Sequence, residues 1–362
     1  MIFSDKDFIF KGSIRFCQLP IFSLSGAEDA SPGPGDRDGT GCFMQVIRDL
    51  SHSELPLNNP VLTIGNFDGV HEGHKALFRK VRERAEALNG QSAVMTFDPH
   101  PIRVMKPGNG PPMITPTEQK LELIGRAGID VVFCLPFTRE FAAVTAEDFV
   151  RRILIERIGI REIVVGYDYS FGAGRKGDIA LLKTLGKELG FEVHVLDPIA
   201  IDGMLVSSTS IRDLVRAGDL DRAARLLGRN YQICGRVISG HGRGGRLLGV
   251  PTANLEPVDE LVPKEGVYAV LVHVDGRTHH GVTNIGNNPT FGDRDVSVET
   301  HLLDFSGDLV GKTIRIDFLE RLRDEKAFGG FEELKEQIER DIQRARGTFE
   351  DLHGRDRVEP GL

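Results

Sequence analysis

The sequence predicts an α/β domain with a parallel sheet, followed by a small antiparallel β-barrel and a C-terminal helix. Short apolar strands alternate with amphipathic helices over residues 44–228, which is the pattern of a parallel sheet wound on both faces. Beyond residue 228 the rhythm changes to short strand-like runs joined by turns, which is typical of a small barrel. A glycine-rich turn at residues 65–74 separates the first strand from the first helix, where such a sheet binds its ligands.

The elements follow in chain order. In the first domain, the expected strands are residues 61–64, 92–97, 130–135, 162–166 and 192–196, and the expected helices are residues 74–88, 117–127, 146–158 and 179–189. In the second domain, the expected strands are residues 231–238, 267–274, 278–285, 296–305 and 313–318. A closing helix is expected because apolar residues share one face at helical spacing, namely Phe331, Leu334, Ile338, Ile342 and Ala345.

The two ends of the chain differ from the rest. Residues 1–43 include a stretch rich in Gly and Pro that cannot supply a core, and we expect them to be disordered or untranslated, with Met44 as an alternative start. We expect residues 44–228 and 229–350 to form the two domains and residues 351–362 to form a flexible tail.

Composition excludes several classes of protein. The 53 acidic residues outnumber the 45 lysines and arginines, so the net charge of −8 offers no general attraction to nucleic acid or to an anionic membrane. Every uncharged apolar run falls far short of the roughly 18 residues that span a bilayer. The four cysteines form no C-x-x-C pair, which argues against a disulfide framework or a zinc site and favours a reducing cytoplasm. The oligomeric state stays open, a weak homo-oligomer included.

The turn at residues 65–74 reads GNFDGVHEGH. Its backbone N–H groups and the positive end of the following helix would face an anion, and His71 and His74 would add two side-chain donors at the same end. The simpler interpretation is a strand–helix connection that carries two surface imidazoles. The first interpretation predicts a phosphate site with movable protons.

Three further stretches of the first domain lie at strand ends or helix starts. Residues 96–101, TFDPHP, form either a rigid loop of a nucleotide site or an ordinary turn. Residues 166–177 place aromatic side chains beside Asp168 and Arg175, which could hold a ring system and its phosphate or simply fold the loop. Residues 207–212, SSTSIR, provide either a helix cap or a clamp for a triphosphate.

The second domain presents a similar choice. The glycine-rich stretch 240–249 could bring its backbone close to a phosphate chain or form a plain hairpin loop. Thr252 and Asn254 follow and supply a hydroxyl and an amide oxygen, both suited to Mg²⁺. If its strand turns Glu299 outward, the carboxylate is a solvated charge. If the strand turns it inward, the carboxylate is a general base for a hydroxyl that attacks a phosphate.

Residues 44–346 resemble the bacterial bifunctional riboflavin kinase/FAD synthetase family. The resemblance rests on GNFDGVHEGH, TFDPHP, GYDYSFG, SSTSIR, LGVPTAN, TNIGNNPTFG, VETHLLDF and LRDE, which occur in that order. The first and fourth are similar to the (H/T)xGH and SSTxIR signatures of the nucleotidyltransferase superfamily, which implies a Rossmann-like first domain that joins FMN to ATP. The second domain is then implied to phosphorylate riboflavin. Val250, Val310 and Ala327 depart from residues common in the family, which bears on flavin affinity and loop closure.

The resemblance implies roles for individual residues. Glu299 would deprotonate riboflavin, and His71 and His74 would stabilise the phosphate during adenylyl transfer, which releases pyrophosphate. In the adenylyltransferase domain, the implied ATP- and phosphate-binding residues are Gly65, Asn66, Phe67, Asp68, Ser207, Ser208, Thr209 and Arg212, and the implied flavin-binding residues are Phe97, Asp168 and Arg175. In the kinase domain, the implied ATP-binding residues are Gly245, Arg246, Gly249, Pro251, Thr252 and Asn254. Of these, Thr252 and Asn254 are also implied to hold Mg²⁺. The implied flavin-binding residues of this domain are Asn284, Gly286, Arg323 and Glu325.

The resemblance implies riboflavin, FMN and ATP as partners and the cytoplasm as the location. Three other classes of protein remain as alternatives. A monofunctional adenylyltransferase with a flavin-binding barrel would keep all activity after Glu299→Gln. A flavin-binding or regulatory protein without catalysis would show no turnover with Mg-ATP. A nucleotidyltransferase for another phosphate ester would ignore FMN. The PTAN and VETH stretches weigh against all three.

Overall fold

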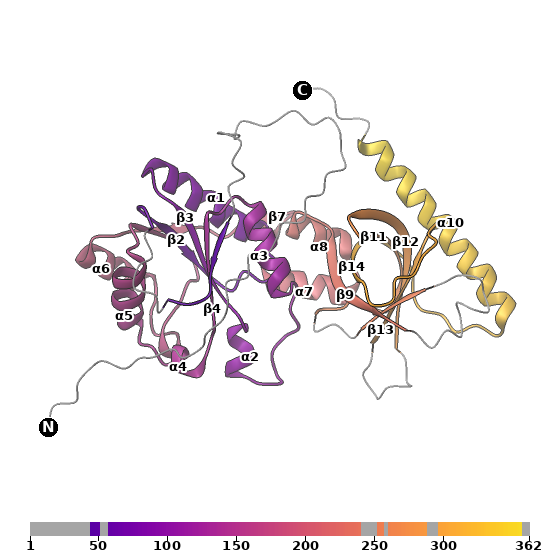
Figure 1. Ribbon diagram of the computed structural model, residues 1–362, viewed down its shortest axis with the longest axis horizontal. Helices are drawn as coiled ribbons and strands as arrows, with labels where there is room; N and C mark the ends of the chain where they lie inside the picture. The colour runs from indigo at the N-terminus through magenta and orange to yellow at the C-terminus, as the bar shows by residue number, and fades with distance from the viewer. Residues whose placement is uncertain (1–43, 51–56, 240–251, 257–259, 288–295, 357–362) are drawn as a thin grey trace. The chain divides into compact units, whose positions relative to one another are not determined.

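The computed structural model describes residues 44–50, 57–239, 252–256, 260–287 and 296–356 (Figure 1). Contacts divide the chain into two compact units. The first holds the described residues up to Phe67 with Lys75–Gly110 and Leu121–Asp197, and the second holds Asp68–His74, Pro111–Lys120 and the chain from Pro198 onward. Two short segments from the first half of the chain, one of them the end of the GNFDGVHEGH turn, therefore belong to the unit that contains the barrel.

The first unit is built on a six-stranded sheet in the order β1-β4-β3-β2-β5-β6, and all of its strand pairs are parallel. The strands are β1 (Gln45–Ile47), β2 (Val61–Ile64), β3 (Ser92–Phe97), β4 (Val131–Leu135), β5 (Glu162–Gly166) and β6 (Glu192–Leu196). The strand order reverses between β2 and β5, so the turn after β2 leaves the sheet at its topological switch point, where ligands bind in such folds. The sequence missed β1, whose 3 residues are too few to show a period.

Helices join these strands and cover both faces of the sheet. They are α1 (Glu72–Ala87), α2 (Pro101–Met105), α3 (Thr117–Arg126), α4 (Arg139–Ala142), α5 (Ala146–Asp148), the π-helical η1 (Phe149–Ile158), the 3₁₀ turn η2 (Ala173–Arg175) and α6 (Ile179–Leu189). One face of the sheet packs on η1 and α6 through Leu62, Met95 and Phe133, and residues of the opposite face such as Val94 and Val132 are equally buried. Two covered faces require strands that are apolar throughout, which explains the run VVFCL in β4.

The second unit contains a closed antiparallel barrel in the order β10-β13-β12-β11-β14-β9. Its strands are β9 (Tyr231–Ile238), β10 (Ala253–Leu255), β11 (Gly266–Val274), β12 (Arg277–Asn287), β13 (Val296–Leu302) and β14 (Thr313–Arg323). Asp275 and Gly276, both with positive φ, make the tight turn between β11 and β12. The sequence did not predict β10, which closes the barrel by pairing with both β13 and β9.

The apolar core of the second unit also includes residues of two helices that precede the barrel in the chain. A small hairpin of β7 (Ala200–Ile201) and β8 (Met204–Leu205) leads into α7 (Ser208–Ala217) and α8 (Leu220–Leu227). Ile211, Val215 and Leu226 from these helices pack in the same apolar core as Tyr268 and Phe318 from the strands. The apolar core of this unit therefore includes residues of helices that lie before residue 229 in the chain.

The C-terminal helix α10 (Phe331–Asp356) lies along the outside of the barrel, against β11, β12 and β14 (Figure 1). Ala345 and Phe349 of the helix pack on Ala269 and Leu322 of the strands. The helix continues to Asp356, so residues 351–356, which the sequence assigned to a tail, are helical. The parallel sheet, the barrel and the closing helix confirm the fold class that the sequence predicted.

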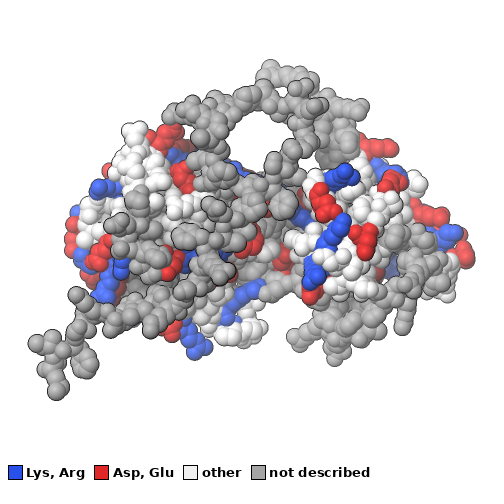
Figure 2. Space-filling model, viewed as in Figure 1, with Lys and Arg blue, Asp and Glu red and all other residues white. Residues whose placement is uncertain are grey.

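None of the helices in the described ranges is both long and apolar enough to cross a lipid bilayer. On the face drawn in Figure 2, lysine and arginine side chains alternate with aspartate and glutamate over the described surface. A mixed surface creates no strong field of one sign on that face, so phosphate sites have to be sought in local clusters.

Candidate functional site

The loop after β2 has an unusual backbone. Phe67, Gly69 and Val70 all have positive φ, at 49°, 90° and 41°. A β-branched valine in this region is strained, and such strain is typical of functional loops that the surrounding structure holds in place. Within the first unit, the ring of Phe67 packs edge-on against Phe78 with centroids 5.0 Å apart. The loop is therefore anchored by its aromatic side chain before it reaches the histidines.

His71 and His74 stack on each other at the start of α1, with ring centroids 3.5 Å apart and planes 18° apart. The backbone N–H of His74 donates to Nδ1 of His71 at 3.3 Å, so His71 carries its proton on Nε2 when neutral. A Cβ at Gly73 would press on the His71 ring at 3.1 Å, which explains the glycine between the two histidines. Burial lowers the pKa of His74 well below its usual value, and the positive charges of His71 and Lys120 lower it further.

Asp68 and Arg212 form a buried ion pair in the second unit. The Asp68 carboxylate also accepts the backbone N–H groups of Ile114 at 3.0 Å and Thr115 at 3.1 Å. The Arg212 Nε donates to the carbonyl oxygen of Pro112 at 3.1 Å. Both side chains therefore bind protein groups and fasten three separated segments together.

The SSTSIR stretch begins α7, as the sequence predicted. Ser207 is the N-cap, and its hydroxyl accepts the N–H of Ser210 at 3.1 Å. The Ser208 hydroxyl donates to the carbonyl oxygen of Asp68 at 2.8 Å, and Thr209 is exposed. The stretch thus joins the helix to the loop that carries His71 and presents one hydroxyl outward.

The other sequence-predicted residues of the adenylyltransferase domain lie in the first unit, at the carboxyl ends of adjacent strands β3, β2 and β5. The side chain of Phe67 packs over Gly65, and the carbonyl oxygen of Asn66 accepts the hydroxyl of Thr96 at 3.2 Å. Phe97 is buried among Phe137, Phe141 and their neighbours, so its ring serves the core. Asp168 and Arg175 are exposed, and the Arg175 Nε donates to the Ser170 hydroxyl at 2.7 Å.

In the barrel, three polar residues face one another across neighbouring strands. Glu299 of β13 lies directly opposite Asn254 of β10 on one side and Asn284 of β12 on the other. Directly opposed residues in antiparallel strands have Cβ atoms about 4.5–5.5 Å apart on the same face of the sheet. The PTAN stretch and the VETH stretch are therefore brought together by strand pairing.

The barrel wall turns Glu299 away from the apolar interior. Its neighbour Val298 packs in the core, and the buried hydroxyl of Thr300 bonds to that of Thr283 at 2.9 Å. Glu299 is nevertheless half-buried, and burial raises the pKa of its carboxyl. From the sequence, we expected a solvated charge if Glu299 faced outward and a base if it faced inward. Glu299 faces outward, but this outer face is covered enough to desolvate its carboxylate.

The remaining flavin-binding candidates of the kinase domain lie around the ends of β12 and β14. A side chain at Gly286 would overlap the carboxylate of Glu325 and lie near the amide of Asn284, so the glycine lets Glu325 approach the strand. Arg323 pairs instead with Asp341 of α10, at 2.8 Å. The structure thus brings Glu325, Gly286 and Asn284 together and holds Arg323 against the helix.

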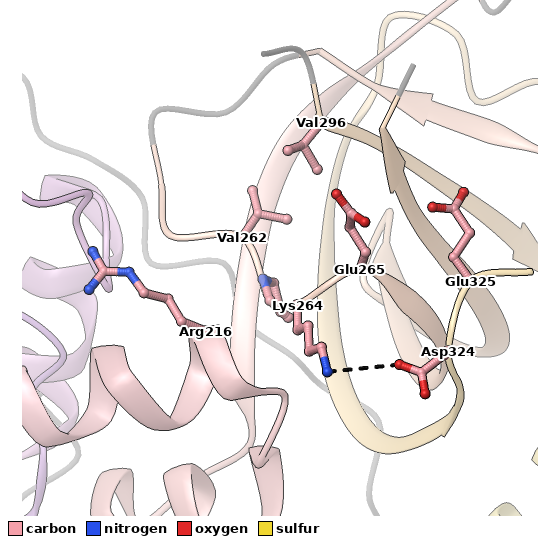
Figure 3. Close-up of a pocket in the computed structure, with 8 residues that line it drawn as sticks. Arg216, Val262, Lys264, Glu265, Val296, Asp324 and Glu325 are labelled. Atoms are coloured by element: carbon pink, nitrogen blue, oxygen red, sulfur yellow. Dashed lines mark ion pairs between the residues drawn. The ribbon is translucent and has the colours of Figure 1, made fainter. Parts of the chain in front are cut away.

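A cavity of about 430 Å³ opens beside Glu325 (Figure 3). It is lined by Arg216, Val262, Pro263, Lys264, Glu265, Val296, Asp324 and Glu325. Lys264 reaches toward Asp324, with Nζ 3.8 Å from the carboxylate, whereas Arg216 extends away from the acidic side chains (Figure 3). The cavity is thus lined by the first residue of β13 and by the two residues that follow β14.

Four of the expected ATP-binding residues, Gly245, Arg246, Gly249 and Pro251, lie outside the described residues. Thr252 is described and exposed, two residues before Asn254. Sequence reasoning missed Arg229. Its Nη1 donates to the carbonyl oxygen of Gly69 at 2.8 Å, and burial of the guanidinium lowers the pKa of Arg229 to about 10. An arginine directly after a helix end carries no signal in the sequence that could have pointed to this contact.

Comparisons with known proteins match both halves of the chain. A family model described as FAD synthetase matches residues 54–210, and one described as riboflavin kinase matches residues 227–349. The chain is 41% identical over 304 residues to the bifunctional riboflavin kinase/FMN adenylyltransferase of Pseudomonas fluorescens, which covers 84% of this chain and 97% of that relative. It is 38% identical over 308 residues to the enzyme of the same name from Escherichia coli K12, covering 84% and 98%.

A solved structure is similar over the same length. It is titled as a macrolide-efflux protein from Streptococcus pneumoniae, and it matches with a TM-score of 0.75 and 30% identity over 84% of this chain and 98% of that one. The curated relatives carry both activities in their names, and the two matched families follow each other in the order that the sequence predicted. ATP, riboflavin and FMN are therefore the substrates. The chain belongs to the bifunctional riboflavin kinase/FMN adenylyltransferase family: it phosphorylates riboflavin in its C-terminal domain and joins FMN to ATP, forming FAD, in its N-terminal domain.

Proposed function

We propose that Glu299, Asn254 and Thr252 carry out the kinase reaction and that His71, His74 and Thr209 carry out adenylyl transfer. The observation that carries the kinase assignment is the pairing of Asn254 and Glu299 on adjacent strands. It unites the two groups that phosphoryl transfer needs, an oxygen ligand for the phosphate-bound cation and a base for the attacking hydroxyl.

The kinase step uses the raised pKa of Glu299. The half-buried carboxylate accepts the proton of a ribityl hydroxyl of riboflavin while the oxygen attacks the γ-phosphate of ATP. The Asn254 amide oxygen and the Thr252 hydroxyl are hard oxygen donors two residues apart, a donor set that suits Mg²⁺. A bound Mg²⁺ would supply positive charge to the phosphate oxygens. Asn284, Gly286 and Glu325 bind the flavin beside the 430 Å³ cavity, with Arg323 holding that region against α10.

The adenylyl transfer uses positioning and electrostatics. An oxygen of the FMN phosphate attacks the α-phosphorus of ATP, and pyrophosphate leaves. The low pKa of His74 keeps its imidazole neutral at pH 7, so His74 and His71 donate hydrogen bonds to the α-phosphate at the positive end of α1. Thr209 contributes its exposed hydroxyl to the phosphates, and Asp68, Ser208 and Arg212 hold the loop in place.

The FMN of this second step binds in the first unit. The exposed side chains of Asp168 and Arg175 follow β5 and contact the flavin or its phosphate, while Phe97 supports the end of β3 from the core. Gly65, Asn66 and Phe67 shape the phosphate loop through their backbone.

The cytoplasm is the proposed location, because it supplies ATP and keeps thiols reduced, and the four cysteines of the sequence form no C-x-x-C pair. Neither reaction calls for nucleic acid or a membrane, and both can run in a monomer or in a weak homo-oligomer.

The experiment that tests the scheme is a chromatographic time course with purified protein, riboflavin, ATP and Mg²⁺. FMN should rise first and FAD should follow, and omission of Mg²⁺ should stop FMN formation. FMN that accumulates without FAD would remove the assignment of the histidine site. If riboflavin stays untouched while added FMN becomes FAD, the barrel residues are not a kinase site.

A further inference from the structure

The backbone of Gly69, in the turn that carries the histidines, is held from both sides by other parts of the second unit. Its N–H donates to the Thr115 hydroxyl at 3.0 Å, and its carbonyl oxygen accepts a hydrogen bond from Nη1 of Arg229 at 2.8 Å. A Cβ at Gly69 would lie 3.2 Å from the side chain of Ile114 and 3.5 Å from that of Leu227, so the chain has little room to shift. Two distant segments, one before α3 and one after α8, therefore fix this point of the turn.

The bond from Arg229 acts on the peptide that leads into His71. The carbonyl group of Gly69 and the N–H of Val70 belong to one planar unit, so a bond to that oxygen sets the direction in which the chain continues. Val70 follows with a φ of 41°, which is strained for a β-branched residue, and its side chain is fully buried. Strained backbone persists only where surrounding contacts hold it, and Arg229 provides one such contact two residues before His71.

Arg229 lies between α8 and β9, two residues after Leu227 and two before Tyr231. Burial lowers its pKa to about 10, which still leaves the guanidinium charged at pH 7. A charged donor makes a stronger hydrogen bond to a carbonyl oxygen than a neutral donor does. The bond to Gly69 is therefore charge-assisted, and its donor keeps its proton at neutral pH.

We propose that Arg229 is a positioning residue for adenylyl transfer: by holding the Gly69 carbonyl, it sets where the two histidine rings meet the α-phosphate of ATP. This inference rests on the proposed histidine site and adds a residue that does not touch the substrate. Arg229 falls in the part of the chain that matches the riboflavin kinase family, residues 227–349, whereas Gly69 falls in the FAD synthetase match, residues 54–210. A residue of the kinase half thus serves the reaction of the other half.

The test compares full-length wild type, Arg229→Met, His71→Ala and the control Arg225→Met. Methionine keeps the unbranched stem of Arg229 and removes its donors. Arg225 lies four residues earlier, on α8, and pairs with Asp221 on the surface, so its substitution should change neither reaction. Arg229→Met should lower kcat for FMN adenylylation by about 10²-fold, because a misplacement of about 1 Å at the reacting groups costs this much.

The kinetic constants separate positioning from other roles. The KM values for ATP and FMN should stay within about threefold, since Arg229 acts on the transition state through the histidines and not on substrate binding. Riboflavin phosphorylation in the same sample should stay within about twofold, which shows that the protein is folded. An arginine that only stabilised the fold would lower both reactions together. An arginine that bound ATP directly would raise the KM for ATP.

A second readout does not depend on turnover. The rings of His71 and His74 are stacked with centroids 3.5 Å apart, so each ring shifts the NMR signals of the other. These ring signals can be assigned by their loss in His71→Ala and His74→Ala. They should move in Arg229→Met and stay in place in Arg225→Met, because only the first variant releases the turn.

The outcomes separate this inference from the histidine site. A loss of fivefold or more in kcat for adenylylation in Arg229→Met, with kinase activity and both KM values kept and the histidine signals moved, supports it. A smaller loss, a loss that takes the form of a raised KM for ATP, or unmoved signals overturns it, and overturns it alone where His71→Ala abolishes adenylylation. Full adenylylation in His71→Ala removes the histidine site and the role of Arg229 together.

Arg229→Met that loses kinase activity as well has not folded, and Arg229→Gln then decides. Its amide is too short to replace the bond to Gly69, but it keeps a polar group at the position. The same fivefold loss in kcat for adenylylation, with kinase activity kept, supports the inference. A smaller loss, or an equal loss of both reactions, overturns it.

Discussion

Among single residues, Glu299 best illustrates how position sets chemistry. An exposed glutamate is a weak base at pH 7 because its carboxylate is stabilised by water. Strand pairing places Glu299 between Asn254 and Asn284 on a face that is only partly exposed, and the resulting burial raises its pKa. The same carboxylate on a fully solvated strand would bind a proton less readily.

Glu299→Gln should lower the rate of riboflavin phosphorylation by about 10²–10⁴-fold, because an amide cannot accept the proton of the attacking hydroxyl. FMN adenylylation in the same sample should stay within about twofold. In the wild type, the kinase rate should fall as the pH drops through the pKa of Glu299, which lies above the value of about 4.3 of an ordinary glutamate. Rate measurements between pH 4.5 and 9 check both points.

Glu339→Gln, on the exposed surface of α10, is the matched control and should leave both rates unchanged. Kinase activity that survives Glu299→Gln at more than a third of wild type would rule out its role as the base.

How far the site could be predicted depends on the residue. His71, Glu299 and Asn254 stand in short motifs whose residue types indicate a particular chemistry, so the sequence alone predicted them as site residues. Arg229 bonds to Gly69, which lies 160 positions earlier in the chain, and no local sequence pattern indicates such a contact. Arg212 was named for its charge, but its pairing with Asp68 is a property of the folded chain.

At the scale of elements, the long strands and helices were predictable because hydrophobic period and length agree. The strand β2 and the helix α6 have the bounds that the sequence indicated, Val61–Ile64 and Ile179–Leu189. The strand β10 was not found, since 3 residues show no period and its identity depends on its neighbours β13 and β9. A strand this short is defined by the strands that pair with it, and a pattern in the nearby sequence does not show those pairings.

The junction of α1, β5 and β6 contains a buried carboxylate. Glu162 at the start of β5 bonds to Arg84 of α1 at 2.6 Å and to Nε2 of His194 of β6 at 2.7 Å. The hydrogen bond from Arg84 holds the pKa of Glu162 below its usual value, although burial opposes this, and His194 contributes in the same direction. A depressed carboxyl pKa means that the ionised form stabilises the fold.

Glu162→Gln should reduce the free energy of unfolding at pH 7 by about 1–3 kcal/mol, since Arg84 loses its charged partner. The stabilisation by Glu162 is fully present above its unfolded pKa of about 4.3 and is lost as the pH falls through its lower folded pKa. The difference between wild type and Glu162→Gln should therefore shrink below pH 4.3. Denaturant unfolding at pH 7, 5 and 3.5 measures it.

Glu188→Gln provides the control, because Glu188 makes an exposed ion pair with Arg151 on the same unit. Its effect should stay below about 0.5–1 kcal/mol at every pH. An equal loss in both variants would show that the buried position of Glu162 has no special weight.

At the scale of the whole molecule, the boundaries of the two compact units differ from the boundaries of the two matched families. The matched families meet between residues 210 and 227, but the helices α7 and α8 belong to the core of the barrel unit. The sequence could not reveal this, because α7 carries an adenylyltransferase signature at its start and its apolar face gives no sign of where it packs. The contacts that tie α7 to the rest of its unit, such as Ser208 with Asp68, join residues 140 positions apart.

A barrel fragment that starts at residue 229 should be markedly less stable than one that starts at residue 198. The longer fragment keeps Ile211, Val215 and Leu226 in the core, and each buried aliphatic side chain contributes about 1.5–3 kcal/mol. Thermal unfolding followed by circular dichroism should give a midpoint at least 10 °C lower for the shorter fragment, or no cooperative transition. Equal midpoints would mean that α7 and α8 add nothing to the barrel.

The helix α7 also constrains how this protein can change over generations. Its first turn carries the SSTSIR stretch, and its apolar face packs in the same core as the strands of the barrel. A lineage that obtained FAD elsewhere could not discard the first half of the gene cleanly, because the cut would expose the interior of the other half. Loss of one activity would instead proceed by point substitutions in the loops, and descendants would keep a silent domain attached to a working one.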